Sequence, residues 1–218
     1  MPSTDNLGWA GRAMEWLAFA TRLVLVNVLF GAGTLAGLVI FGMFPAAVAA
    51  TTVLARLRTG AAGEHLVRDF VTVYRSQFWH VNRVGSIFWL AGVVLFLNFL
   101  TVLVPAGTPE LSSPVPSVLL VIAALAGLGT MAAAATAVAV CSRYRDSVIR
   151  TWRTAFVLPL VSPVMTLSLL ISLVAFAVIF SGIGVLVPLV GASVPLLLSG
   201  WLVGHRLAGL EAAEPAFA

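Results

Sequence analysis

The chain contains no lysine and very little charge of either sign. Only 9% of its 218 residues are charged, and the twelve basic residues other than histidine are all arginine. Soluble globular proteins carry roughly 25% charged residues, so this composition excludes an ordinary water-soluble domain. The formal net charge of +4 does not indicate nucleic-acid binding. The arginines stand instead at the ends of apolar stretches, where membrane orientation signals are found.

The sequence motifs of common enzymes and metal sites are also missing. The single cysteine, Cys141, excludes a disulfide within the chain. Neither zinc-ligand spacing nor the ATP-binding pattern Gly-x-x-x-x-Gly-Lys occurs, and no serine stands in a nucleophile elbow. We therefore expect a protein that is not an enzyme, has no cofactor or metal, and does not bind nucleic acid.

Long uncharged stretches are the strongest indication of the fold class in this sequence. Four of them contain neither a charged side chain nor a histidine: residues 23–55, 84–109, 111–142 and 154–204. A helix needs roughly 20 apolar residues to cross about 30 Å of hydrocarbon, and each stretch exceeds that length. The sequence therefore predicts an all-α polytopic membrane protein, a single transmembrane domain surrounded by a lipid bilayer.

Turn signals and charges divide these stretches into a predicted six-helix transmembrane bundle. The approximate limits of the spans are 23–41, 46–58, 84–104, 115–141, 155–180 and 183–204. Residues 7–22 mix tryptophans with charges, which predicts an interfacial helix before the first span. Ser181–Gly182 is the expected turn between the last two spans.

The number of spans depends on the segment around Pro45. Proline lacks an N–H donor and starts or breaks helices, so we expect a tight reversal at Gly42–Phe44 and a short helix that starts at Pro45. Arg56 and Arg58 can extend the reach of this helix to the headgroups. The alternative is one kinked helix from Leu23 to Ala55 and five spans. The positive-inside bias favours six, with both termini and all arginines on the cytoplasmic side of the inner (plasma) membrane.

Two parts of the chain resemble each other. Residues 46–58 and 133–145 are both rich in small side chains and end in Arg-x-Arg. Farther on, Tyr74–Phe78 and Trp152–Phe156 share the order aromatic, Arg, hydroxyl, any residue, Phe. Internal repeats are common in transporters. The alternative is coincidence in a chain rich in alanine, valine and arginine.

Residues 64–83 predict an amphipathic cytoplasmic helix, because apolar residues such as Leu66 and Val73 recur at helical spacing. This helix either caps the bundle or docks a cytoplasmic partner. Candidate docking residues lie in this helix, at the ends of two spans and in the loop 142–153: Arg56, Arg58, Phe70, Tyr74, Arg75, Phe78, Arg143, Arg145, Trp152 and Arg153.

Strong polar groups are rare within the predicted spans. All eight carboxylates lie outside them, so a buried acid that couples transport to protons is not expected. Asn27 and Asn98 are the strongest candidates for a polar role at depth. An amide in hydrocarbon needs a partner, and bonds between helices there are worth roughly 0.6–2 kcal/mol. We expect both to join helices; the alternative is that they line a substrate path.

Three segments together resemble a known family: Asn27–Phe30, Phe41–Ala50 and Phe70–Phe78. They look like the YesL-like family of small bacterial membrane proteins, a domain of unknown function. In that family an Asn in the first span precedes a Gly-(x)-Pro-Ala break, a basic helix end and an aromatic-rich cytoplasmic segment. The resemblance covers residues 8–100 well.

The family motif falls on Asn27, Gly42, Pro45 and Ala46 of this chain. The resemblance implies an association with carbohydrate utilisation, because such proteins are often encoded beside sugar ABC importers; it implies no defined activity. We therefore expect a non-enzymatic accessory or assembly subunit of a carbohydrate ABC-type uptake system, with a permease or ATPase subunit as its partner. A small transporter or channel in its own right is the alternative, because interrupted helices often border substrate sites.

Overall fold

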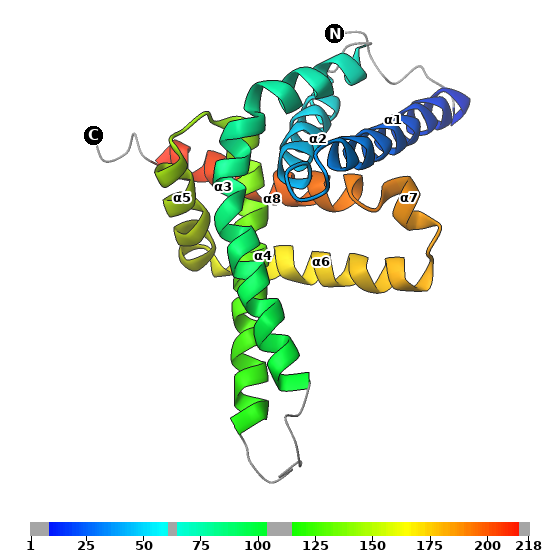
Figure 1. The fold of residues 1–218 in the computed structure, drawn as a ribbon. Coiled ribbons are helices and arrows are strands. Elements are labelled where there is room, and N and C mark those ends of the chain that lie inside the picture. The colour runs from blue at the N-terminus through cyan, green and yellow to red at the C-terminus, as the bar shows by residue number, and fades with distance from the viewer. Residues whose placement is uncertain (1–8, 61–64, 104–114, 214–218) are drawn as a thin grey trace.

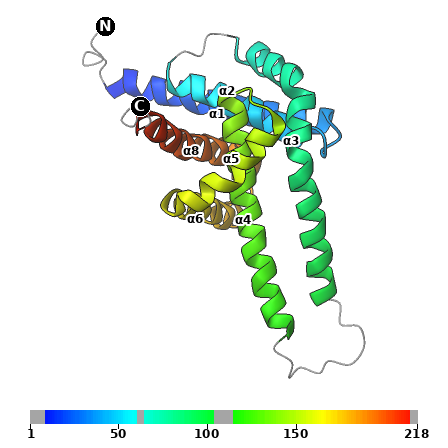
Figure 2. The ribbon, with the colours of Figure 1, turned by 90° about the vertical axis from the view of Figure 1, so that its left-hand side faces the viewer.

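The computed structural model describes residues 9–60, 65–103 and 115–213, and this part of the chain is helical without strands. Its helices, in chain order, are α1 (Trp9–Ala36), α2 (Met43–Arg58), α3 (Leu66–Leu103), α4 (Val115–Arg143), α5 (Val148–Val161), α6 (Pro163–Gly182), α7 (Leu186–Val190) and α8 (Ser193–Ala213). The predicted all-α class is confirmed. Helices α3 and α4 form a long antiparallel hairpin, and α1, α6 and α8 run across this hairpin rather than along it (Figure 1, Figure 2).

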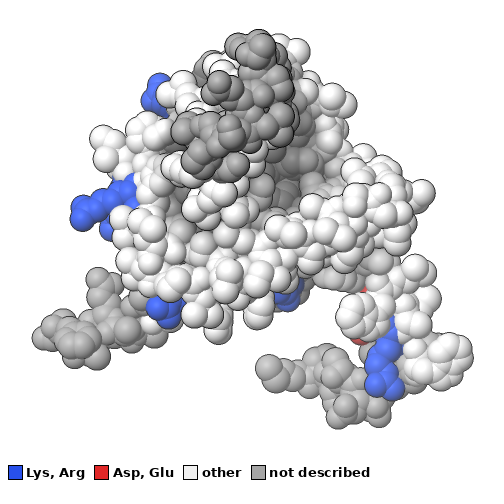
Figure 3. All heavy atoms as spheres, turned by 90° about the horizontal axis from the view of Figure 1, so that it is seen from below, with Lys and Arg blue, Asp and Glu red and all other residues white. Residues whose placement is uncertain are grey.

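Four helices are long and apolar enough to cross a membrane. These segments are Gly11–Ala36, Leu66–Thr101, Val118–Arg143 and Pro163–Gly182. Large apolar side chains are exposed along them, including Leu90, Leu125 and Val164. Figure 3 shows one face of the molecule that is almost free of charge, with arginines at its margins. Such a surface is unfavourable in water and favourable in lipid, which suggests a membrane protein.

The predicted count of six spans is not confirmed. Helix α2 has 16 residues. At 1.5 Å per residue it extends about 24 Å, which is less than the hydrocarbon thickness. Helix α8, which contains His205 and Arg206, is not among the four apolar candidates.

The chain reverses between α1 and α2, so the alternative of one kinked helix from Leu23 to Ala55 is wrong. The turn occupies residues 37–42, earlier than the predicted Gly42–Phe44, and the first span ends at Ala36 instead of residue 41. Leu38 and Val39 adopt positive φ angles of 55° and 65° within it. Pro45 lies in the first turn of α2, where its missing N–H leaves no hydrogen bond unmade.

Two pairs of predicted helices are in fact single helices. Residues 9–22 of the predicted interfacial helix continue into the first span as α1, and residues 66–83 of the predicted cytoplasmic helix continue into the third span as α3. Residues 7, 8 and 64 of these predictions lie outside the described part of the chain. No proline stands at either junction. A charged side chain alone does not end a helix, because the backbone hydrogen bonds continue past it.

Two predicted spans are divided instead. The span 155–180 breaks at Ser162, where φ is −122° and ψ is 69°. Pro163 follows and disfavours helical backbone at the residue before it. The span 183–204 breaks between α7 and α8. The turn predicted at Ser181–Gly182 lies slightly later, at residues 183–185, because Ser181 and Gly182 are the last residues of α6.

The core lies where α2 and α4 meet. Ala47 and Val48 of α2 share a buried cluster with Ala133 and Ala137 of α4. Small side chains let two helix backbones approach closely. These two helices contain the segments with similar sequences, so the internal resemblance falls on two helices that pack against each other.

The turn between α1 and α2 gives a prediction about Gly42. A Cβ there would lie 2.6 Å from the carbonyl oxygen of Gly33, whereas a Cβ on Gly31 would meet nothing within 4 Å. Gly42→Ala should therefore destabilise the protein by about 1–3 kcal/mol, as overpacking does. The control Gly31→Ala should be neutral or slightly stabilising, because alanine favours helix. Thermal unfolding in detergent measures both, and equal midpoints for the two variants would contradict the tight turn.

Candidate functional site

The side chain of Asn27 on α1 reaches the break between α7 and α8. Its Nδ2 donates hydrogen bonds to the carbonyl oxygens of Pro188 at 2.7 Å and Val187 at 3.3 Å. Its Oδ1 accepts from the backbone N–H of Ala192 at 2.8 Å and of Ser193 at 3.3 Å. The residue is 8% exposed. As the sequence suggested, Asn27 joins helices.

The Asn27 amide stands in for a missing backbone hydrogen bond. Pro188 and Ala192 are four residues apart, the spacing at which a carbonyl and an N–H bond to each other in an α-helix. The amide accepts from one of these groups and donates to the other. A side chain that inserts into this ladder is a recognised cause of a sharp break. The separation of α7 from α8 therefore depends on a residue more than 150 positions away.

The other residues of the family motif build the contact between α1 and α2. Pro45 and Ala46 are fully buried. A Cβ on Gly33 of α1 would lie only 3.3 Å from the Cβ of Ala46, so glycine permits this approach. Asn98, by contrast, is exposed on α3. The structure therefore does not bring the two predicted intramembrane amides together.

The aromatic residues predicted for docking hold helices together instead. The Tyr74 hydroxyl donates to the carbonyl oxygen of Gly33 at 2.8 Å, and Trp152 Nε1 donates to that of Val84 at 3.0 Å. These two residues occupy corresponding places in the two similar segments. Each one therefore fastens its own helix to a helix earlier in the chain.

The docking role predicted for Phe70 is wrong, because this residue is only 3% exposed. It packs in a buried cluster with Val53 and Leu57 of α2. Phe78 is half-buried, with its ring centroid 5.5 Å from that of Tyr74. The apolar face of this amphipathic segment is therefore used inside the molecule and is not available to a partner.

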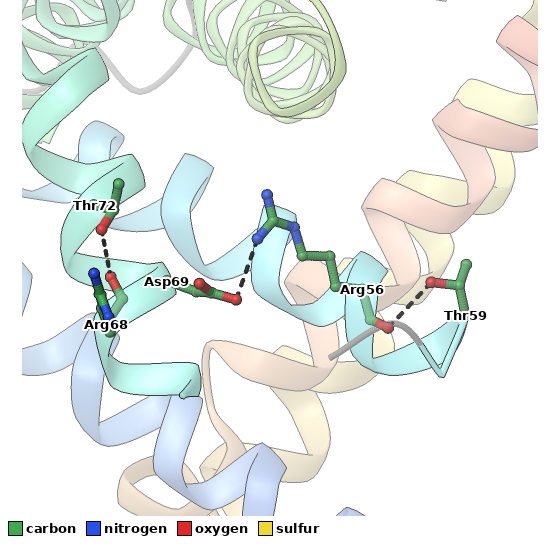
Figure 4. A network of polar contacts seen from close by, with 5 residues as sticks. All are labelled: Arg56, Thr59, Arg68, Asp69 and Thr72. Carbon is green, nitrogen blue, oxygen red and sulfur yellow. Dashed lines mark hydrogen bonds and ion pairs between the residues drawn. The ribbon is translucent and has the colours of Figure 1, made fainter. Parts of the chain in front are cut away.

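The arginines predicted for docking fall into three groups. Arg56 forms an ion pair of 3.2 Å with Asp69 in the first turn of α3 (Figure 4). Both side chains are more than one third exposed, so the pair contributes about 0–1 kcal/mol. Arg75, Arg145 and Arg153 are exposed, and no ion pair joins them to another described residue.

Arg58 and Arg143 line a small cavity between α2, α4 and α8, together with Trp201. Arg143 Nη1 donates to the carbonyl oxygen of Gly204 at 3.3 Å. Arg143 therefore fastens the end of α4 to α8. The sequence placed both arginines at the ends of helices but gave no sign that they share one cavity.

Arg206 was missed by sequence reasoning. Its Nε donates to the Ser162 hydroxyl at 2.9 Å, at the break between α5 and α6. Ser162 is 4% exposed. The sequence does show that an arginine follows the last uncharged stretch. It does not show its partner, which lies 44 positions away in the sequence.

An apolar cavity of about 280 Å³ lies between α1, α2, α4, α6 and α8. Its walls include Phe30, Phe44 and Met131, and it reaches Ala192 at the break before α8. Among its described lining residues only Ser199 has a polar side chain, and that hydroxyl donates to the carbonyl oxygen of Leu196. Such a lining suits an alkyl or aromatic group better than a sugar, which needs several hydrogen-bonding partners. Within the described ranges, no three His, Cys, Asp or Glu residues are grouped to hold a metal ion.

The amide bridge predicts a large effect of Asn27→Leu. Leucine fills similar space but leaves the part-buried backbone groups at Pro188 and Ala192 without partners. In apolar surroundings each unsatisfied group costs about 1–3 kcal/mol. We expect a lower unfolding midpoint in detergent and faster amide hydrogen exchange at residues 192–193. Asn98→Leu, on the exposed face of α3, is the matched control and should change neither. Unchanged exchange in Asn27→Leu would contradict the bridge.

Comparison with known proteins finds a family that part of the chain resembles. Residues 23–99 match a family described as a protein of unknown function, DUF624. YteU, an uncharacterized protein of Bacillus subtilis, is 27% identical over 94 residues, which is 43% of this chain and 42% of YteU. The match thus spans about two fifths of this curated relative, and no solved structure matches the chain. The matched range contains all four motif residues, Asn27, Gly42, Pro45 and Ala46, and the resemblance to the YesL-like proteins is confirmed. Residues 23–99 of this chain are therefore similar to the DUF624 family, whose function is unknown.

Proposed function

We propose that this membrane protein is a non-enzymatic accessory or assembly subunit of a carbohydrate uptake system of the ABC type. Its partner is a permease or ATPase subunit. In this proposal it lies in the inner membrane with both termini in the cytoplasm. The carbohydrate element rests on the YesL-like resemblance, because such proteins are often encoded beside sugar ABC importers. The orientation rests on the clustering of arginine at the ends of the apolar stretches.

The observation that carries this proposal is a set of exposed arginines at one end of the molecule. They are Arg68, Arg75, Arg145 and Arg153, from the start of α3, the α4–α5 junction and α5 (Figure 1). Two described carboxylates nearby, Asp69 and Asp146, pair with other arginines. A surface with uncompensated positive charge favours association with an acidic partner surface. This end is therefore the proposed contact with the uptake system.

A transporter acting alone is the second candidate, and the break between α7 and α8 favours it. Discontinuous helices border the substrate sites of many transporters. The cavity of about 280 Å³ beside this break is apolar, however. Its lining favours an apolar solute over a sugar, so this candidate fits the carbohydrate association less well.

The accessory role predicts capture of a transport subunit. The tagged protein, extracted in mild detergent, should bring down an ABC permease or ATPase. The double variant Arg145→Glu/Arg153→Glu should recover less than half as much, because reversed charge repels an acidic surface. Arg12→Glu, an exposed arginine on α1, is the matched control and should recover the normal amount. Recovery of no transport subunit by the unaltered protein would contradict the proposal.

The accessory role also predicts that the chain alone does not carry sugar. Vesicles that contain only the purified protein should take up labelled sugars no faster than empty vesicles. Ala134→Trp, which fills the apolar cavity, should change nothing in this assay. Sugar uptake that is abolished by Ala134→Trp would overturn the accessory role and favour the transporter.

A further inference from the structure

We infer that a groove between the α5–α6 break and the second half of α8 binds one anionic phospholipid. The inference rests on the membrane location in the proposed function but does not require the uptake partner. The groove has a volume of about 440 Å³. That volume lies in the range of pockets that hold small ligands, roughly 300–1,000 Å³.

One end of the groove is basic. Arg206 is held there by the hydrogen bond of 2.9 Å from its Nε to the Ser162 hydroxyl. Ser162 is buried, so this bond holds the exposed Arg206 side chain against the α5–α6 break. Arginine has five N–H donors, and the bond to Ser162 uses one of them. No ion pair joins Arg206 to any described side chain, so its charge is available to a ligand.

The remainder of the groove is mostly apolar. Val161, Val164, Met165 and Leu202 contribute to its walls, at the junction of α5, α6 and α8. Val161 and Val164 are 60% and 79% exposed, so this surface lies open to whatever surrounds the protein. Acyl chains gain free energy when they cover such a surface.

The combination of a guanidinium group and apolar walls favours an anionic phospholipid as the ligand. Guanidinium groups bind phosphate through paired hydrogen bonds. A free phosphate ion would use only the Arg206 end, whereas a phospholipid also covers the apolar walls with its acyl chains. A zwitterionic lipid brings a cationic group close to Arg206, which opposes binding. Basic pockets between membrane helices are known sites for anionic headgroups.

Native mass spectrometry of the full-length protein in detergent tests this inference. Phosphatidylglycerol should bind more tightly than phosphatidylcholine with the same acyl chains. Arg206→Gln should weaken phosphatidylglycerol binding about fivefold, the change expected when one arginine near an anionic headgroup is lost. It should weaken phosphatidylcholine binding less, because the cationic choline group already offsets the attraction of that phosphate to Arg206. Arg68→Gln removes the same charge at an exposed site on α3 and should have no effect on either lipid.

A second pair of variants tests the apolar part of the groove. Gly209 lines it, and a Cβ there would meet nothing within 4 Å, so Gly209→Leu fills the groove without a backbone clash. Gly127 on α4 is equally open, which makes Gly127→Leu the matched control. Only Gly209→Leu should reduce phosphatidylglycerol binding.

Three results would overturn the lipid site. They are equal binding by Arg206→Gln and Arg68→Gln, equal binding by Gly209→Leu and Gly127→Leu, and displacement of the lipid by inorganic phosphate at equal concentration. Arg206→Gln should still recover the transport subunit as the unaltered protein does. Failure of the lipid site is thereby distinguishable from failure of the accessory role.

Discussion

The interaction on which the C-terminal half of this protein depends is the amide bridge of Asn27. In hydrocarbon, backbone N–H and carbonyl groups must be satisfied within the protein, so an interrupted helix is stable only where another group replaces its lost bonds. Asn27 supplies this replacement for Pro188 and Ala192. The bridge fixes where α8 begins and holds α8 to α1. The contacts of α8 with Arg143 and the position of Arg206 follow from that placement.

Helix α8 packs against the two small-residue helices through its own glycines. A Cβ on Gly200 would lie 2.8 Å from Cγ2 of Thr51 on α2, and a Cβ on Gly204 would overlap the Arg143 guanidinium at the end of α4. Close packing between membrane helices relies on such small residues, because the hydrophobic effect does not drive association within lipid. The similar sequences of α2 and α4 therefore form two adjacent surfaces on which α8 rests.

Much of the local structure could be predicted from the sequence, because its signals are local. The Gly-Met-Phe-Pro segment predicted the reversal before α2, and the Ser181–Gly182 signal predicted the end of α6, although the turn itself follows at residues 183–185. The sequence does not predict the merged helix α3, because the change from a charged to an uncharged stretch after residue 83 suggests a boundary, whereas charge does not interrupt backbone bonding. The break at Pro163 was missed for the opposite reason: proline is often tolerated in membrane helices, and only the geometry of Ser162 shows that the helix ends there.

The candidate sites also combine local features, which the sequence shows, with tertiary contacts, which it does not show. Asn27 stood out because an amide is unusual in an apolar span, but its partners were invisible in the sequence. The burial of Phe70 and the bond between Arg206 and Ser162 depend on tertiary contacts across many residues. No periodicity or spacing encodes such contacts, so a side chain on an amphipathic face could not be assigned to the core or to a partner.

The unbroken course of α3 has a mechanical consequence. Its 38 residues extend about 57 Å along the helix axis at 1.5 Å per residue. A hydrocarbon layer of about 30 Å leaves roughly 27 Å beyond it, which is the length of the 18 residues from Leu66 to Arg83. The arginine-bearing segment and the lipid-facing segment therefore belong to one helix, which bends between them (Figure 1, Figure 2). A partner that moves the outer arm therefore acts on the apolar arm through a continuous run of backbone hydrogen bonds.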